Sequence, residues 1–133
     1  MLERYPPDDP REWLNRANSS LSMAKKESDD VYLEDLCYQA QQSAEKAIKA
    51  IFVERNIEFP YTHDIYQLLS LVDDMGLDVP ESIREAERLS PFATIIRYPG
   101  VAPPIEHDEY LELLEITERV IQWAEGIIKR SPD

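Results

Sequence analysis

The stretch Gln39-Ala40-Gln41-Gln42-Ser43-Ala44-Glu45-Lys46-Ala47-Ile48-Lys49-Ala50 decides the fold class of this chain. It lies in a segment from Leu33 to about Asn56 that contains no Gly or Pro and repeats its apolar residues at the helical period. The segment therefore predicts one helix of about six turns. Its alanines permit close approach of another helix, which predicts that one flank packs tightly inside a bundle or against a partner.

Capping residues and apolar periodicity predict four more helices around this one. They are expected at residues 10–27, 62–76, 80–90 and 107–130. Asp9 and Pro10 form the start signal of the first, and Gly76 suits a left-handed C-terminal cap. The Pro-rich segment 94–106 is predicted to be a loop, where functional sites tend to lie. The sequence thus predicts an all-α, up-and-down helical bundle of about five helices, three long and two short, forming a single domain over residues 1–133.

The charge and cysteine content narrow the classes of protein. The 133 residues include 14 Lys and Arg against 27 Asp and Glu, which gives a formal net charge of -13. Such a charge disfavours sequence-independent binding to nucleic acid, so contact with a phosphate backbone requires a local basic patch. The single Cys37 is predicted to be a packed thiol. Because the chain has neither a signal-peptide pattern at its N-terminus nor an apolar run of about 18 residues, we expect a soluble cytoplasmic protein.

The common motifs of enzymes and metal sites are missing from the chain. Its three glycines are isolated and form no phosphate-binding loop. Two histidines and one cysteine cannot build a Cys-His zinc site by themselves. Neither His63 nor His107 follows a Glu three residues earlier, the pattern that metal-binding helical bundles use. We therefore predict no metal and no cofactor.

Three separated motifs carry a family resemblance. The stretch 39–50, followed by Thr62-His63-Asp64-Ile65 and Arg97-Tyr98-Pro99, resembles the HEPN family, named for higher eukaryotes and prokaryotes nucleotide-binding. The resemblance covers about residues 10–130. It implies a helical bundle, commonly dimeric, whose bacterial and archaeal members are often encoded beside a minimal nucleotidyltransferase as a toxin–antitoxin pair. The apolar surface of the two longest predicted helices also predicts a homodimer.

The same resemblance implies a catalytic site. Active relatives are metal-independent ribonucleases whose motif is an Arg followed four to six residues later by a His, duplicated across the dimer cleft. The His handles protons, and the Arg stabilises the charged phosphorane. In this chain Arg97 is present, but the next histidine is His107, ten positions on. Catalysis by Arg97 and His107 therefore requires the Pro-rich loop to bring the two side chains together.

Four further residues are predicted to bind a ligand, each with a structural alternative. Lys46 and Lys49 share a helix face and either form an anion patch with Arg97 or pair with nearby carboxylates. His63 either contacts the ligand or hydrogen-bonds within its own turn. Tyr98 either stacks on a base or packs against the bundle.

Three functions follow from these residues. The first is a dimeric HEPN module that is paired with a nucleotidyltransferase and binds a nucleotide or RNA through Lys46, Lys49, His63 and Arg97. The second is a ribonuclease toxin that uses Arg97 and His107. The third is a non-catalytic helical scaffold. The altered Arg-His spacing and the acidic charge favour the first function.

Overall fold

A computed structural model describes residues 2–94 and 104–130 of the chain. Its elements occur in the order α1 (Pro10–Ala24), α2 (Leu33–Glu54), α3 (Ile65–Asp74), α4 (Glu81–Arg84), the 3₁₀ helix η1 (Glu85–Ala93) and α5 (His107–Arg130). These described residues contain no strand, and the all-α prediction is confirmed. None of the described helices is long and apolar enough to cross a membrane.

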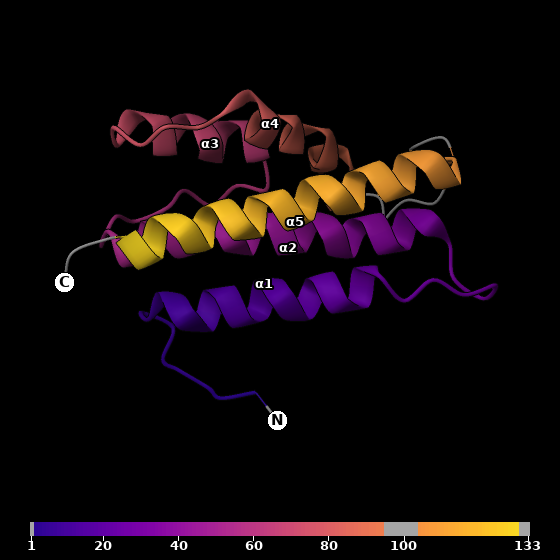
Figure 1. Cartoon of the computed structure of the whole chain (residues 1–133), viewed down its shortest axis with the longest axis horizontal. Coiled ribbons are helices and arrows are strands. Elements are labelled where there is room, and N and C mark those ends of the chain that lie inside the picture. The colour runs from indigo at the N-terminus through magenta and orange to yellow at the C-terminus, as the bar shows by residue number, and fades with distance from the viewer. Residues whose placement is uncertain (1, 95–103, 131–133) are drawn as a thin grey trace.

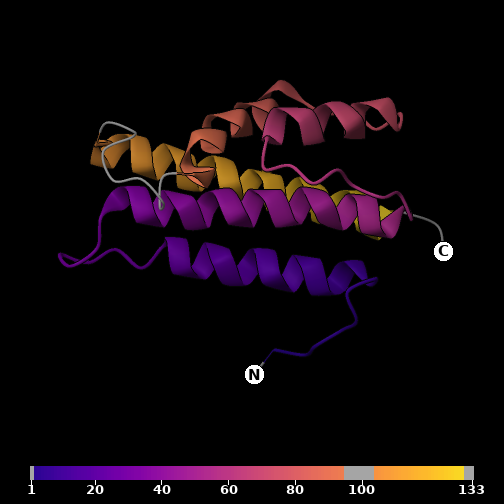
Figure 2. The same cartoon turned by 180° about the vertical axis from the view of Figure 1, so that it is seen from behind.

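The three long helices have nearly parallel axes, and the short helices α3 and α4 lie on the side away from α1 (Figures 1 and 2). Helix α2 is central, because it packs against α1, α3, η1 and α5. The chain reverses between α1 and α2. In contrast, α2 and α5 run in the same direction, so that Arg55 and Arg130 at their C-terminal ends line one pocket. The bundle therefore combines antiparallel and parallel neighbours.

The alanines of α2 allow α1 to approach it closely. Ala40, Ala44 and Ala47 are at most 1% exposed. Between them, the Ser43 hydroxyl donates a 2.7 Å hydrogen bond to the backbone carbonyl of Ala17 on α1. Such a bond between a side chain and a neighbouring helix backbone requires short side chains at the contact. The tight packing predicted for this flank is thus confirmed, and a helix of the same chain makes it.

Three of the predicted helices differ from the structure in their bounds or type. The helix predicted for residues 62–76 is α3, which spans Ile65–Asp74. Helix α1 ends at Ala24 rather than near Glu27, and the buried Tyr110 hydroxyl of α5 donates to the Ala24 carbonyl at 2.6 Å. This bond satisfies one of the carbonyls that a helix end leaves unpaired. The single helix predicted for residues 80–90 is instead α4 followed by η1, which continues through Pro91. Proline has no N–H to donate, so regular α-helical bonding cannot continue there.

Other local predictions hold. Gly76 has a φ of +87°, as the left-handed cap after α3 requires. Cys37 is fully buried in the core, and burial raises the pKa of its thiol to about 12. The thiol is therefore a packed, protonated group, as its apolar neighbours predicted.

Candidate functional site

Two chemically different sites lie side by side on α2. One is a buried ion cluster, which we call the Glu45 cluster and which consists of Gln41, Glu45, Lys49 and His63. The other is a surface cavity of about 400 Å³ that Lys46 lines, which we call the Lys46 pocket. Because adjacent positions on a helix point about 100° apart, Glu45 and Lys46 can belong to separate environments.

Three donors surround the carboxylate of Glu45. Its Oε2 accepts a 2.7 Å bond from Lys49 Nζ, and its Oε1 accepts a 2.8 Å bond from Gln41 Nε2. His63 Nδ1 lies 3.0 Å from the same Oε1. Burial raises the pKa of Glu45, but the bonds from Lys49, His63 and Gln41 together hold that pKa below its ordinary value. The Glu45 cluster is therefore anchored on an ionised carboxylate.

Two of the residues predicted to bind a ligand, Lys49 and His63, instead contact Glu45 in this cluster. Lys49 is only 8% exposed and its ammonium faces Glu45, with the ring centroid of Phe59 at 4.9 Å. His63 is half exposed but points one ring nitrogen at the same carboxylate. Lys49 thus pairs with a carboxylate, which is the structural alternative to anion binding that the sequence offered. The pair is buried rather than solvated.

The Lys46 pocket is formed by three segments of the chain. The N-terminal segment 2–9, which we call the strap, contributes Tyr5 and Pro7 to it. The remaining lining residues come from α1 and α2 and are Glu12, Trp13, Arg16 and Lys46. One wall is therefore apolar and aromatic, whereas the other carries two cations and one carboxylate.

The two cations of the pocket have different partners. Lys46 Nζ donates to the Ser20 hydroxyl at 3.1 Å, and Arg16 Nε donates to Glu12 Oε2 at 2.7 Å. Burial, together with the neighbouring charge of Arg16, lowers the pKa of Lys46. An anion in the pocket would relieve both effects, because it compensates the desolvated ammonium and separates the two like charges.

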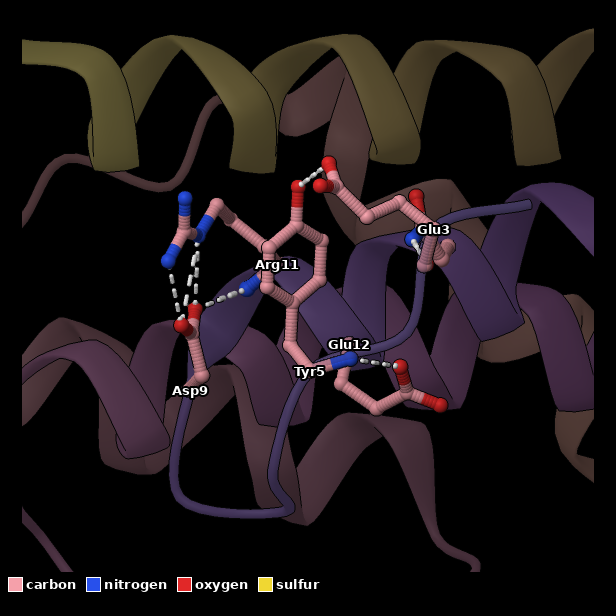
Figure 3. A network of polar contacts seen from close by, with 6 residues as sticks. Glu3, Tyr5, Asp9, Arg11 and Glu12 are labelled. Carbon is pink, nitrogen blue, oxygen red and sulfur yellow. Dashed lines mark hydrogen bonds and ion pairs between the residues drawn. The ribbon is translucent and has the colours of Figure 1, made fainter.

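The aromatic wall is held in place by specific contacts. Trp13 Nε1 donates to the Pro7 carbonyl at 2.8 Å, and the Trp13 ring meets the Phe59 ring edge to face with centroids 5.3 Å apart. Figure 3 shows Tyr5 on the strap, with Arg11 against its ring and its backbone N–H pointing to Glu12. These contacts order the wall before any ligand arrives, which reduces the entropic cost of binding.

The other predicted site residues lie elsewhere. Arg97 and Tyr98 fall outside the described residues. His107 is the first residue of α5, and its Nε2 lies 2.9 Å from Glu27 Oε2, just beyond the C-terminal end of α1. Arg16 stands eleven residues before Glu27, so His107 and the Lys46 pocket are separated by roughly 15 Å along the helix direction. The structure thus brings Lys49 and His63 together, and leaves His107 apart from both sites.

The pocket contains residues that the sequence does not single out. Glu12 and Trp13 stand four and three residues before Arg16, so each is a neighbour of Arg16 on the helix surface, which is a weak signal of a common site. Nothing in that spacing indicates that Lys46, thirty positions later, lies opposite them. Within residues 2–94 and 104–130, no three His, Cys, Asp or Glu side chains are grouped so that they could hold a metal ion.

Comparison with known proteins agrees with this architecture. The sequence-family model of the HEPN domain matches residues 10–127 of this chain. Two solved structures are similar: ST0689, an archaeal HEPN homologue, and TT1696 from Thermus thermophilus. The first has 27% identity and a TM-score of 0.70, and the alignment covers 96% of this chain and 99% of that one. The second has 28% identity and a TM-score of 0.74, with 88% of this chain and 96% of that one covered. No curated protein matches the chain.

The match spans the helices that build both sites on α2, from the start of α1 to near the end of α5. The matched range also includes the three sequence motifs at residues 39–50, 62–65 and 97–99. This chain therefore belongs to the HEPN domain family.

Proposed function

We propose that this HEPN protein is a nucleotide-binding interaction module, which acts as a homodimer and is paired with a minimal nucleotidyltransferase of the toxin–antitoxin type. The observation that carries the binding part is the Lys46 pocket, where two cations face an ordered aromatic wall. Cations that contact phosphate oxygens and aromatic rings that contact a base are two recurring elements of nucleotide recognition in proteins.

Within this proposal the residues on α2 have distinct tasks. Lys46 contacts the phosphate, and Arg16 assists it from α1. Lys49 and His63 hold Glu45 and thereby fix the part of α2 from which Lys46 projects. The acidic charge of the whole chain repels extended nucleic acid, so a small nucleotide is favoured over a long polymer as the ligand.

The partner part of the proposal rests on membership of the HEPN family. The alanine flank of α2, which entered the sequence-based expectation of a dimer, is covered by α1 within one chain. A dimer must therefore use other surfaces. Sedimentation equilibrium at micromolar concentration tests it, with the dimer mass expected and a stable monomer of 15.5 kDa as the contrary outcome.

The binding part is tested by titrating nucleotides into the purified protein and recording tryptophan fluorescence and heat. Trp13 lines the pocket, so its emission is expected to change when a ligand enters. Replacement of Lys46 by Gln is expected to weaken binding about tenfold or more, because one charge-assisted contact to phosphate is worth roughly 1.5–3 kcal/mol.

A matched variant separates the pocket from the overall charge. Lys26 is exposed and lies outside the pocket, and Lys26→Gln removes the same charge from the chain. Its affinity is expected to remain within twofold of the wild type. Equal losses in Lys46→Gln and Lys26→Gln would assign the binding to long-range charge and contradict a site at Lys46.

A further inference from the structure

The Lys46 pocket contains a carboxylate beside the two cations that are proposed to contact phosphate. Glu12 lines the pocket between the strap and Arg16, and its side chain is 13% exposed. Building on the proposed function, we infer that the pocket takes a nucleoside monophosphate and that Glu12 is the specificity residue that excludes nucleotides with two or more phosphates.

Glu12 is fixed in place by two donors. Its Oε1 accepts a 3.0 Å bond from the backbone N–H of Tyr5, and its Oε2 accepts the 2.7 Å bond from Arg16 Nε (Figure 3 shows the first of these). The bond from Tyr5 and, to a lesser extent, the bond from Arg16 lower the pKa of Glu12. The side chain is therefore ionised at neutral pH. Two hydrogen bonds thus hold the negative charge of Glu12 beside the pocket.

The charges in the pocket favour one phosphate over several. The ionised side chains that line it are Glu12, Arg16 and Lys46, with a formal sum of +1. A phosphate monoester carries about -1.5 to -2 at neutral pH, which two cations can complement beside one carboxylate. A second and third phosphate would add negative charge next to Glu12 in a chain whose net charge is already -13.

The donors that remain in the pocket are also few. Arg16 directs Nε to Glu12, and within the described residues its Nη groups have no hydrogen-bond partner. Lys46 directs one N–H to Ser20. The free donors of two side chains can satisfy the oxygens of one phosphate, whereas a triphosphate needs a longer row of donors, such as a glycine-rich loop supplies.

The dimensions and the aromatic wall indicate the rest of the ligand. A cavity of about 400 Å³ is near the small end of the range for ligand sites, which begins at about 300 Å³. Tyr5 and Trp13 provide apolar surface, and Trp13 is already held by Pro7 and Phe59. A planar base fits against such a wall by stacking, so the ligand combines one phosphate with one aromatic ring system.

The test compares AMP, ADP and ATP by calorimetry on the wild type and on Glu12→Gln, in buffer with chelator. The wild type is expected to bind AMP at least about tenfold more tightly than ATP. In Glu12→Gln the amide oxygen can still accept the Tyr5 N–H while the charge is gone, so the AMP preference is expected to fall to about threefold or less. Adenosine and inorganic phosphate are each expected to bind more weakly than AMP.

Glu87→Gln is the matched control, because Glu87 is exposed on η1 and lies outside the pocket. This variant is expected to keep the wild-type preference for AMP. If the wild type binds ATP as tightly as AMP, the monophosphate inference is overturned while nucleotide binding stands. If phosphate alone binds as tightly as AMP, the aromatic part of the inference is overturned. If no nucleotide binds to the wild type, the proposed function itself fails.

Discussion

Lys46 and Lys49 stand three residues apart on one helix, yet they occupy opposite environments. Lys49 is buried and its ammonium lies 2.7 Å from the carboxylate of Glu45. Lys46 lines a solvent-connected pocket, where it contacts a serine hydroxyl, and no ion pair with it occurs among residues 2–94 and 104–130. One lysine is thus part of the scaffold, and the other is available to a ligand.

The difference shows that a lysine-rich helix face is not by itself an anion site. A buried ammonium stabilises the fold only when its carboxylate is in place, because desolvation otherwise outweighs the charge interaction. The ammonium of Lys46 is half-buried and lies near the charge of Arg16. Burial and this neighbouring positive charge both lower its pKa, and an anion nearby would stabilise its charged form. The partner of each lysine therefore determines its role. Mutation of Lys49 should mainly reduce stability, whereas mutation of Lys46 should mainly reduce ligand affinity.

The largest effect is expected for Lys49→Met. The substitution leaves the buried carboxylate of Glu45 without the ammonium that pairs with it. We expect the free energy of unfolding to fall by about 3 kcal/mol, the lower end of the range for breaking a buried ion pair. The midpoint of thermal unfolding should fall by roughly 10 °C for a chain of this size. Circular dichroism during heating and urea unfolding measure both values.

Lys46→Met is the matched comparison for that prediction. It loses one hydrogen bond to Ser20 at a half-buried position, so the free energy of unfolding is expected to change by less than about 1 kcal/mol. Its nucleotide affinity should nevertheless fall. Equal destabilisation by the two substitutions would contradict the division of tasks between the lysines.

A second, smaller effect is expected from pH. The folded-state pKa of Glu45 lies below its unfolded value, which is about 4.3. Its ionised form therefore stabilises the fold above that value, and the stabilisation is lost as pH falls through the folded-state pKa. Between about pH 5 and pH 3, the wild type should lose stability more steeply than Glu45→Gln, as urea unfolding at each pH measures.

The exposed Glu87→Gln provides the control for this pH dependence. Because Glu87 shares no contact with the Glu45 cluster, this variant should follow the wild-type slope. Parallel curves for the wild type and Glu45→Gln would mean that other carboxylates account for the whole acid response.

The smallest effect is expected at His107, which lies apart from both lysines. Its pair with Glu27 is exposed, so His107→Ala should change the unfolding free energy by no more than about 1 kcal/mol. As a binding module, the protein should cleave single-stranded RNA in chelator no faster than Arg97→Ala or His107→Ala does. Cleavage by the wild type that both substitutions abolish would instead establish the ribonuclease function.

Local sequence determined the helices because each boundary signal acts within a few residues. Asp9 accepts from the backbone N–H of Arg11 as an N-cap, Pro10 opens α1, and Gly76 adopts the positive φ after α3. The alanines of α2 and the family motifs made the all-α fold predictable from the same local information. At Ala24, where α1 ends earlier than predicted, the carbonyl accepts a hydrogen bond from the distant Tyr110 hydroxyl, which the local sequence does not indicate.

Sequence spacing also placed Glu45 and Lys49 one helical turn apart, as an i,i+4 pair. Only the tertiary structure decided that this pair is buried, because His63 and Phe59 from the segment after α2 cover it. Burial depends on which segment packs against a helix face, and the residues on that face do not indicate which segment this is.

The Lys46 pocket depends on the tertiary structure even more than the burial of the Glu45–Lys49 pair does. Arg16 and Lys46 come together because α1 and α2 pack in a register that also brings Ser43 to Ala17. The strap then closes one side through Glu12 and Trp13. Helix formation depends on neighbours within about four residues, whereas a pocket depends on the relative position of whole helices, which local periodicity does not specify.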